Sequence, residues 1–218
     1  MPALEWVKPP RQARSQKTLE RILDAAEALI LETGSAAFTV AEVARRGRSS
    51  IGSLYARFSG KDALLRSVFE RFVEQAEATV TSALDATRWR DAPMTAIVEA
   101  TVHFAVQVFT ERRPLIAALM LRAVDDTDML GLAERLSATT AARLIALGGE
   151  RRAEIGHPDL PLAMRFVTWS VLSSLEASCL HNPAEPLLEP VALAAELARM
   201  CTSYLGIVSP HSQANTSR

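Results

Sequence analysis

Residues 37–62, with the sequence AFTVAEVARRGRSSIGSLYARFSGKD, constrain the fold of this chain more than any other segment. Thr39 followed three residues later by Glu42 matches a capping box, in which both side chains bind free backbone N–H groups at a helix start. The segment predicts a short helix, a polar turn at 47–49 and a second short helix from 50 to 58. Two short helices joined by a tight turn can place the second helix in the major groove of DNA.

Apolar residues recur at helical spacing along most of the chain, and no strand pattern of useful length is present. The first helix is predicted over 14–33, where Gly34 closes it in the position that favours a left-handed residue. We therefore expect an all-α fold of about nine helices: 14–33, 39–46, 50–58, 61–84, 97–109, 115–121, 127–152, 162–180 and 187–205.

The pattern also predicts how the chain is divided. Residues 1–13 are expected to be a flexible basic arm, because Pro9-Pro10 blocks a helix. The three-helix DNA-binding domain is expected over 14–60, a helical domain over 61–208, and a disordered polar tail over 209–218. Lys8, Arg11 and Arg14 could reach phosphates or the minor groove, or take no part in binding.

The formal net charge of −1 is unfavourable for a nucleic-acid binder, but the charge is unevenly distributed. Residues 1–62 hold ten Lys/Arg and seven Asp/Glu, whereas the remainder holds fourteen and eighteen. A positive face concentrated near the N-terminus would explain how a nearly neutral chain binds DNA.

Several other classes of protein are disfavoured by the sequence. The first residues lack the apolar core of a secretory signal, and no uncharged stretch approaches the roughly 18 apolar residues that span a membrane. Cys179 and Cys201 have no CxxC spacing, so we expect buried thiols and a cytoplasmic protein. The four histidines lack metal-ligand spacing, so no metal and no cofactor is predicted. We also find no nucleophile–base pair or paired carboxylates, so the chain is not expected to be an enzyme.

The chain resembles the TetR family of bacterial repressors over about residues 14–72. The family pattern is an amphipathic helix ending in Gly, then T-x-x-x-[IV]-A, then S-x-G-x-[LI]-Y-x-[HY]-F-x-x-K. Here it reads Gly34, then Thr39 with Val43-Ala44, then SIGSLYARFSGK from Ser50 to Lys61. Two departures occur: the family's A-G-V-S turn is here Gly47-Arg48-Ser49-Ser50, and the usual His or Tyr before Phe58 is Arg57.

Matching this motif residue by residue gives the candidate DNA-binding side chains. Polar and basic residues outside the apolar anchors would meet bases or phosphates: Thr39, Arg48, Ser49, Ser50, Gly52, Ser53, Tyr55, Arg57 and Lys61. The alternative for this stretch is an ordinary helical hairpin with a solvated basic face, and for Tyr55 a purely structural role in the core.

The resemblance also implies that the C-terminal domain dimerises through its last two long helices and binds a small organic effector. The helices concerned would be those at about 162–180 and 187–205. For the effector we consider apolar residues interleaved with a few polar ones: His103, Phe104, Gln107, Phe109, Met120, Trp169 and Glu176. These residues could equally pack the core.

The expected function is a homodimeric transcriptional repressor that a small organic effector releases from a pseudo-palindromic DNA operator. The alternative is a helical enzyme, or a ligand-binding protein without DNA, that carries an incidental basic hairpin.

Overall fold

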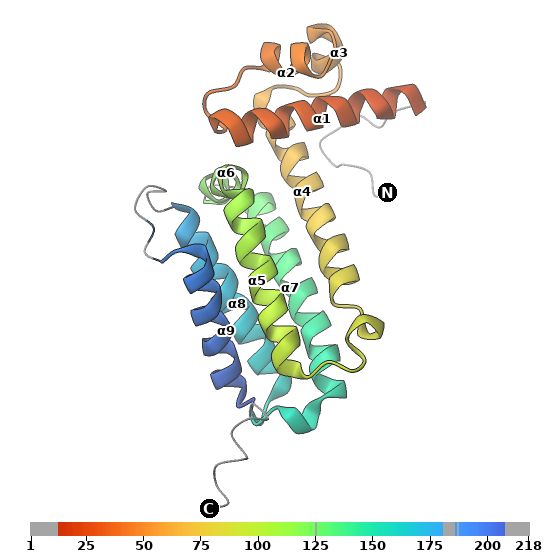
Figure 1. Ribbon diagram of the computed structural model, residues 1–218. Helices are drawn as coiled ribbons and strands as arrows, with labels where there is room; N and C mark the ends of the chain where they lie inside the picture. The colour runs from red at the N-terminus through yellow and green to blue at the C-terminus, as the bar shows by residue number, and fades with distance from the viewer. Residues whose placement is uncertain (1–12, 125, 181–185, 187, 208–218) are drawn as a thin grey trace, which may run out of the picture. The chain divides into compact units, whose positions relative to one another are not determined.

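The computed structural model describes residues 13–124, 126–180, 186 and 188–207. Over these residues the fold is all-α, as predicted, with nine α-helices, two 3-10 helices and no strand (Figure 1). The predicted tail at 209–218 lies outside the described residues, as does the predicted arm apart from Ala13, which begins the first helix.

The helices follow one another with short connections. Their bounds are α1 Ala13–Thr33, α2 Val40–Arg46, α3 Ile51–Tyr55, α4 Lys61–Ala83, η1 Ala86–Trp89, α5 Met94–Glu111, α6 Arg113–Ala123, α7 Thr127–Glu150, η2 Arg152–Glu154, α8 Leu160–Leu180 and α9 Pro190–Leu205.

The chain forms two compact units. Unit 1 comprises the described residues up to Ala76 together with Arg112–Ala133, and unit 2 comprises Glu77–Glu111 and the described residues from Glu134 onward. Unit 1 extends beyond the predicted DNA-binding domain of 14–60, since it includes most of α4, all of α6 and the start of α7.

Unit 1 is organised around the amphipathic helix α1. Its buried residues Leu19, Ile22, Leu23, Ala26 and Ile30 recur at the i, i+3, i+4 spacing of one helix face. α1 packs against α2 and α6, and α2 packs against α3 (Figure 1). Gly34 ends α1 with φ +81°, a backbone conformation that glycine adopts without steric cost, as the sequence predicts.

Charged side chains join three helices of unit 1. Arg71 of α4 pairs with Asp24 at 2.6 Å and with Glu27 at 2.8 Å, both on α1. Glu27 also pairs with Arg112, the residue that precedes α6. Glu27 and Arg71 have only 13% and 11% of their side chains exposed, so both charges depend on this network for compensation.

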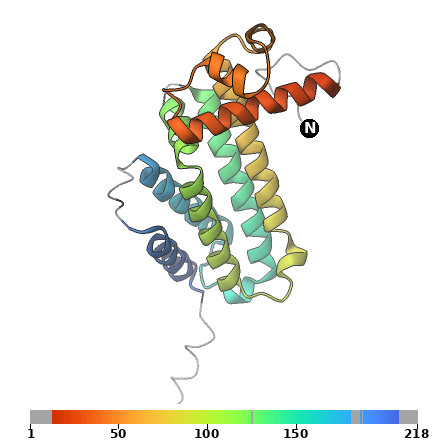
Figure 2. The ribbon, with the colours of Figure 1, turned by 45° about the horizontal axis from the view of Figure 1, so that its top comes forward.

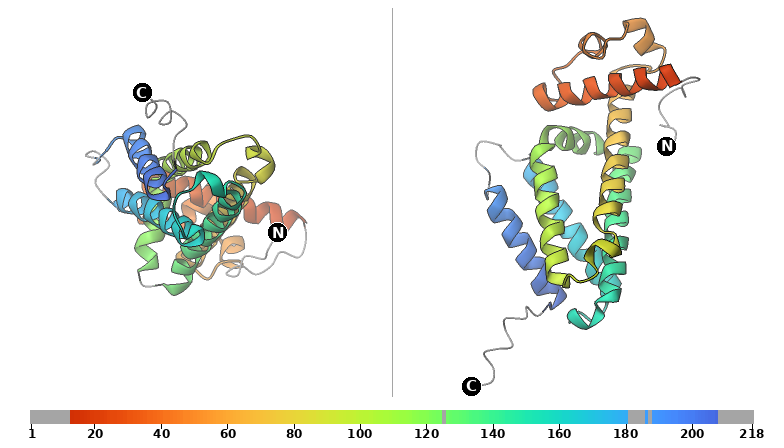
Figure 3. Two further views of the ribbon diagram at one scale, coloured as in Figure 1. Left: turned by 90° about the horizontal axis from the view of Figure 1, so that it is seen from below. Right: turned by 45° about the vertical axis from the view of Figure 1, so that its right-hand side comes forward.

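Unit 2 is a bundle in which α5 packs against both α8 and α9. α8 and α9 also pack against each other and run side by side in opposite directions (Figures 2 and 3). The shared core includes fully buried Met94, Ile97, Ala163, Met164 and Leu205. Both cysteines, Cys179 and Cys201, are buried free thiols in this unit, as expected.

One local expectation needs correction. The second short helix was predicted to reach Phe58 but ends at Tyr55, because the N–H groups of Arg57 and Phe58 both bond to the carbonyl of Leu54 and tighten the chain there. Gly148 and Gly149 do not interrupt the helix predicted over 127–152, since α7 continues through both residues. Gly148 instead allows close packing, since a Cβ there would lie 2.9 Å from the Met164 methyl group.

Candidate nucleic-acid interface and candidate ligand cavity

The start of α2 has the capping box predicted from the sequence. The Glu42 backbone N–H donates to the Thr39 hydroxyl at 3.2 Å, and the Thr39 backbone N–H donates to the Glu42 carboxylate at 2.7 Å. The bond from the Thr39 backbone, followed by that from the Thr39 hydroxyl, lowers the pKa of Glu42. The cap fixes where α2 begins, and thereby the direction in which the chain enters the turn.

The turn between α2 and α3 departs from the family pattern, and its geometry explains how. Arg48 occupies the left-handed region with φ +49°, where the family pattern has glycine. Gly47 lies where α2 meets α1, because a Cβ there would be 3.1 Å from the carbonyl oxygens of Arg21 and Val43. The glycine is therefore used for close packing with α1, and the arginine takes the strained conformation of the turn.

Helix α3 is anchored on one side and open on the other. Ser50 caps it by accepting the Ser53 backbone N–H at 3.0 Å. Leu54 is fully buried and Tyr55 is 54% exposed, so the helix directs the tyrosine away from the core. A Cβ added at Gly52 would meet nothing within 4 Å, which leaves the backbone on this side open to a large partner.

Arg57 and Lys61 are engaged with the protein itself. The Arg57 guanidinium donates to the Ser15 hydroxyl at 2.7 Å and ties the end of α3 to the start of α1. The Lys61 ammonium donates to the carbonyls of Ala36 at 3.0 Å and Phe38 at 2.8 Å, and lies 4.3 Å from the centre of the Phe38 ring. An ammonium group has three N–H bonds, so one of them remains available for a phosphate.

The nine predicted DNA-binding residues thus divide into two groups. Arg48, Ser50, Gly52 and Tyr55 are exposed around the turn and α3, together with Thr39 at the start of α2. Ser49, Ser53, Arg57 and Lys61 are partly buried in the same region.

Two further exposed residues were not among the predicted ones. Ile51, the first residue of α3, is 49% exposed and could contact a thymine methyl group. Arg45, at the end of α2, is exposed, whereas its neighbour Arg46 pairs with Glu32 at 2.5 Å.

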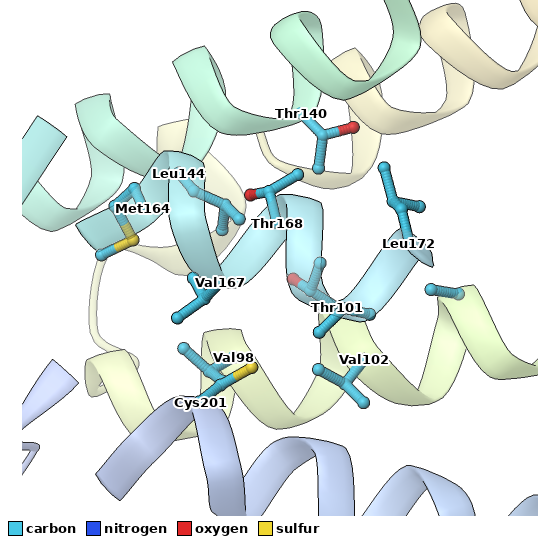
Figure 4. Close-up of a pocket in the computed structure, with 12 residues that line it drawn as sticks. Val98, Thr101, Val102, Thr140, Leu144, Met164, Val167, Thr168, Leu172 and Cys201 are labelled. Atoms are coloured by element: carbon cyan, nitrogen blue, oxygen red, sulfur yellow. The ribbon is translucent and has the colours of Figure 1, made fainter. Parts of the chain in front are cut away.

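Unit 2 contains a cavity between α5, α7, α8 and α9, with about 450 Å³ of empty space including the part open to solvent (Figure 4). The cavity itself has a volume of about 50 Å³, which lies below the range of about 300–1,000 Å³ that is usual for small-molecule sites, so it fits a ligand of only a few non-hydrogen atoms. The wall consists of aliphatic residues, three threonines, a methionine and a cysteine: Val98, Thr101, Val102, Ala105, Thr140, Leu144, Met164, Val167, Thr168, Val171, Leu172 and Cys201.

None of the seven residues predicted for the effector lines this cavity. His103, Phe104 and Gln107 are exposed on α5, and Trp169 on α8 is 61% exposed. Phe109 packs against the core of unit 2, Glu176 is partly buried on α8, and Met120 belongs to unit 1. Burial raises the pKa of Glu176. Six of the predicted residues lie on α5 and α8, which both contribute to the cavity, but at positions outside its wall.

The outer faces of α8 and α9 carry large exposed apolar side chains. Phe166 on α8 has its ring 6.2 Å from that of Trp169 and 4.9 Å from that of Tyr204 on α9. Leu162, Val191 and Met200 extend this exposed apolar surface along the same two helices.

Neither a membrane-spanning helix nor a cluster of metal-binding side chains occurs in the described residues. Over the part of the chain that the structure describes, no helix is long and apolar enough to cross a membrane. In the same residues, no group of three or more His, Cys, Asp or Glu side chains is arranged to hold a metal ion.

Comparison with known proteins identifies the N-terminal region. Residues 22–68 match the family model of the bacterial regulatory proteins of the tetR family, a range that includes the capped α2–turn–α3 segment. No curated protein matches the chain.

Solved structures match over most of the chain. A protein of Mesorhizobium loti described as a tetR-family transcriptional regulator is 19% identical with a TM-score of 0.73, covering 89% of this chain and 98% of that one. A tetR-family regulator of Streptomyces coelicolor is 16% identical with a TM-score of 0.68, covering 87% and 80%. GusR of Salmonella enterica is 20% identical with a TM-score of 0.61, covering 87% and 95%. At identities this low, the structural similarity establishes a shared fold and nothing more specific. Residues 22–68 therefore form the N-terminal domain of the tetR family of bacterial regulatory proteins, within a chain that has the fold of tetR-family transcriptional regulators.

Proposed function

We propose that this protein is a cytoplasmic, sequence-specific DNA-binding repressor that acts as a homodimer and leaves its operator when a small organic molecule binds. The observation that carries the proposal is the capped α2–turn–α3 segment within the family match, which presents Arg48, Ser50 and Tyr55 to solvent. Exposed polar and basic groups on a short helix after a tight turn are what major-groove recognition requires.

The proposed DNA contacts separate into two kinds. Arg48, Ser50 and Tyr55, with Ile51, are placed to meet base edges or the adjacent backbone. Thr39 and the remaining N–H of Lys61 would bind phosphate near the start of α2. Ser49, Gly52, Ser53 and Arg57 shape and support this surface.

A salt titration tests DNA binding. Fluorescence anisotropy on DNA from the protein's own promoter region should give a log–log slope of about −5 to −7 if a dimer neutralises roughly six to eight phosphates. Salt-independent binding, or none, would contradict the proposal.

Arg48→Ala should weaken DNA binding, whereas the matched control Arg88→Ala, which removes an exposed charge from unit 2, should leave DNA binding unchanged.

The homodimer is proposed to form through α8 and α9. Their exposed Phe166, Trp169 and Tyr204 form an aromatic cluster that a second copy would bury. A dimer also doubles the number of bases that one short helix can read.

Light scattering after gel filtration tests this interface. Trp169→Glu should convert the dimer to a monomer and reduce DNA affinity, because a carboxylate would be buried in an apolar contact. Leu121→Glu, at a residue that is 66% exposed on α6, is the control and should leave the dimer intact. A Trp169→Glu protein that stays dimeric would contradict the proposed interface.

Repression and release require a functional readout. A reporter placed behind the operator should be silenced by the protein and restored by the effector. Increased transcription in the presence of the protein alone would indicate an activator instead.

A further inference from the structure

The cavity of unit 2 has a wall without charge. Its twelve lining residues include no Lys, Arg, His, Asp or Glu. Burial raises the pKa of the Cys201 thiol to about 11, so this group is also neutral at physiological pH. An ionised ligand would lose its hydration here without gaining a counter-ion, which makes its entry unfavourable.

Three threonines supply the polar atoms of the wall, and two of them are already engaged. The hydroxyl of Thr101 donates to the carbonyl of Ile97 at 2.7 Å, and that of Thr140 donates to the carbonyl of Leu136 at 2.8 Å. Both bonds run to the preceding turn of the same helix, so these hydroxyls need no further acceptor.

Thr168 differs from the other two. Its residue is only 5% exposed, and no hydrogen-bond partner for its buried hydroxyl is found among the described residues. Buried polar groups in proteins nearly always have a partner, so such a group inside a cavity points to a ligand atom that completes it. Figure 4 shows Thr168 on α8, with Thr140 on the neighbouring α7 and Thr101 on α5.

We propose that the ligand of this cavity is a small, neutral, mainly hydrocarbon molecule with one hydrogen-bonding oxygen, and that the Thr168 hydroxyl binds that oxygen. Alcohols, ketones and phenols have this chemistry, whereas carboxylates, amines, phosphates and sugars do not. As regards regulation, the inference rests on the proposed function, since this ligand would be the effector.

The first test measures binding to the full chain by isothermal titration calorimetry, without DNA. The probes share a four-carbon chain, which suits the small volume of the cavity: 1-butanol and 2-butanone are neutral, and butanoate and butylammonium are charged. The neutral probes should bind, and the ions should bind at least tenfold more weakly. Equal binding of ions and neutral probes, or no binding of either neutral probe, would overturn the proposal.

The second test assigns the hydroxyl. Thr168→Val keeps the shape of the side chain and should weaken the binding of 2-butanone about three- to tenfold, the effect of one lost hydrogen bond. Thr140→Val is the matched control, because its hydroxyl is already bonded to Leu136, and it should change the affinity less than twofold. If both variants weakened binding equally, Thr168 would not be the recognising group.

The third test assigns the place. Ala105→Leu adds volume to the cavity wall and should abolish binding of both neutral probes while leaving the melting temperature unchanged or higher. A fully retained affinity in this variant would place the ligand elsewhere and overturn the proposal.

Repeating the anisotropy assay with 2-butanone separates this inference from the proposed function. If the probe binds and the protein stays on DNA, the ligand chemistry stands and release by an effector is contradicted. If DNA binding is normal and neither neutral probe binds the free protein, the ligand chemistry fails while the DNA-binding function stands.

Discussion

The α2–turn–α3 segment of unit 1 and the cavity of unit 2 differ in the polarity of their residues and in how their shapes are fixed. The first is polar and basic, and its shape is fixed by hydrogen bonds between residues close in sequence, such as Thr39 with Glu42. The second is lined by uncharged, mostly apolar residues from four helices, from Val98 to Cys201. The α2–turn–α3 segment is therefore specified by local sequence, whereas the cavity forms only once the helices of unit 2 have packed.

The hydroxyl groups show the same contrast on a smaller scale. Thr39 and Ser50 each accept a backbone N–H from a residue three positions later, so both are satisfied before any ligand arrives. The hydroxyl of Thr168 has no partner in the described chain. An exposed capping hydroxyl positions its helix before a ligand binds, whereas a buried hydroxyl without a partner in the chain needs one from a ligand.

The largest expected effect compares the filled core of unit 1 with the hollow core of unit 2. Phe58 is fully buried, so Phe58→Ala should reduce the free energy of unfolding by about 3–5 kcal/mol and abolish DNA binding. Leu172→Ala, at the partly buried wall of the cavity, should cost less than half as much, since fewer atoms surround that side chain. Urea denaturation followed by circular dichroism measures both, and equal losses would remove the distinction between the two cores.

Local sequence predicted the α2–turn–α3 segment well. The cap at Thr39, the start of the second short helix at Ser50 and the closing Gly34 all occur where the pattern placed them, because each depends on a few adjacent residues. The end of α3 was not predictable in this way. The pattern of apolar residues continues to Phe58, but the helix ends at Tyr55. The chain then turns, and the turn buries the ring of Phe58.

The cavity could not be predicted because it depends on what the packing leaves empty. Its α5 residues Val98, Thr101, Val102 and Ala105 follow the i, i+3, i+4, i+7 pattern of an inward face, which the sequence does contain. Of the predicted α5 residues, His103, Phe104 and Gln107 lie on the exposed side of the helix. Periodicity identifies an inward face, but it does not show which inward positions border a space.

The second prediction concerns the charges that unit 1 holds inside. Glu27→Ala would leave Arg71, with 11% of its side chain exposed, and Arg112 without their shared carboxylate. We expect a loss of about 2–3 kcal/mol in the free energy of unfolding, because a partly buried charge loses its partner.

Asp24→Ala is the matched control for the Glu27 variant. Asp24 pairs with the same Arg71 at 2.6 Å, but its side chain is 70% exposed and its charge is screened by solvent. The expected loss is about 0–1 kcal/mol, measured by the same denaturation. If Asp24→Ala cost as much as Glu27→Ala, burial would not explain the importance of the network.

The third prediction separates strain from charge in the turn. Arg48 has φ +49°, so Arg48→Gly should raise the free energy of unfolding by about 0.5–1 kcal/mol while weakening DNA binding. Arg48→Ala keeps a Cβ in the left-handed conformation and should weaken DNA binding without that gain. A gain in both variants would show that the charge of Arg48, and not its backbone conformation, opposes folding.

The smallest expected effect is a difference between the pKa values of two glutamates, Glu42 and Glu176. Hydrogen bonds from Thr39 lower the pKa of Glu42, so the capping box contributes stability at higher pH and loses it as pH falls through the lowered pKa. Burial raises the pKa of Glu176, so its contribution is present at low pH and is lost as pH rises through the raised pKa. An NMR titration of the side-chain carboxyl carbons should place Glu42 below the ordinary value of 4.5 and Glu176 above it.

Thr39→Val tests the cause of the shift at Glu42. It removes the hydroxyl and keeps the backbone N–H, which is the larger of the two causes, so the pKa of Glu42 should rise only part of the way toward 4.5. The pKa of Glu176 should not move in this variant, because burial alone raises it. A full return of Glu42 to 4.5 would mean that losing the hydroxyl also breaks the backbone bond, and that the start of α2 depends on both halves of the capping box at once.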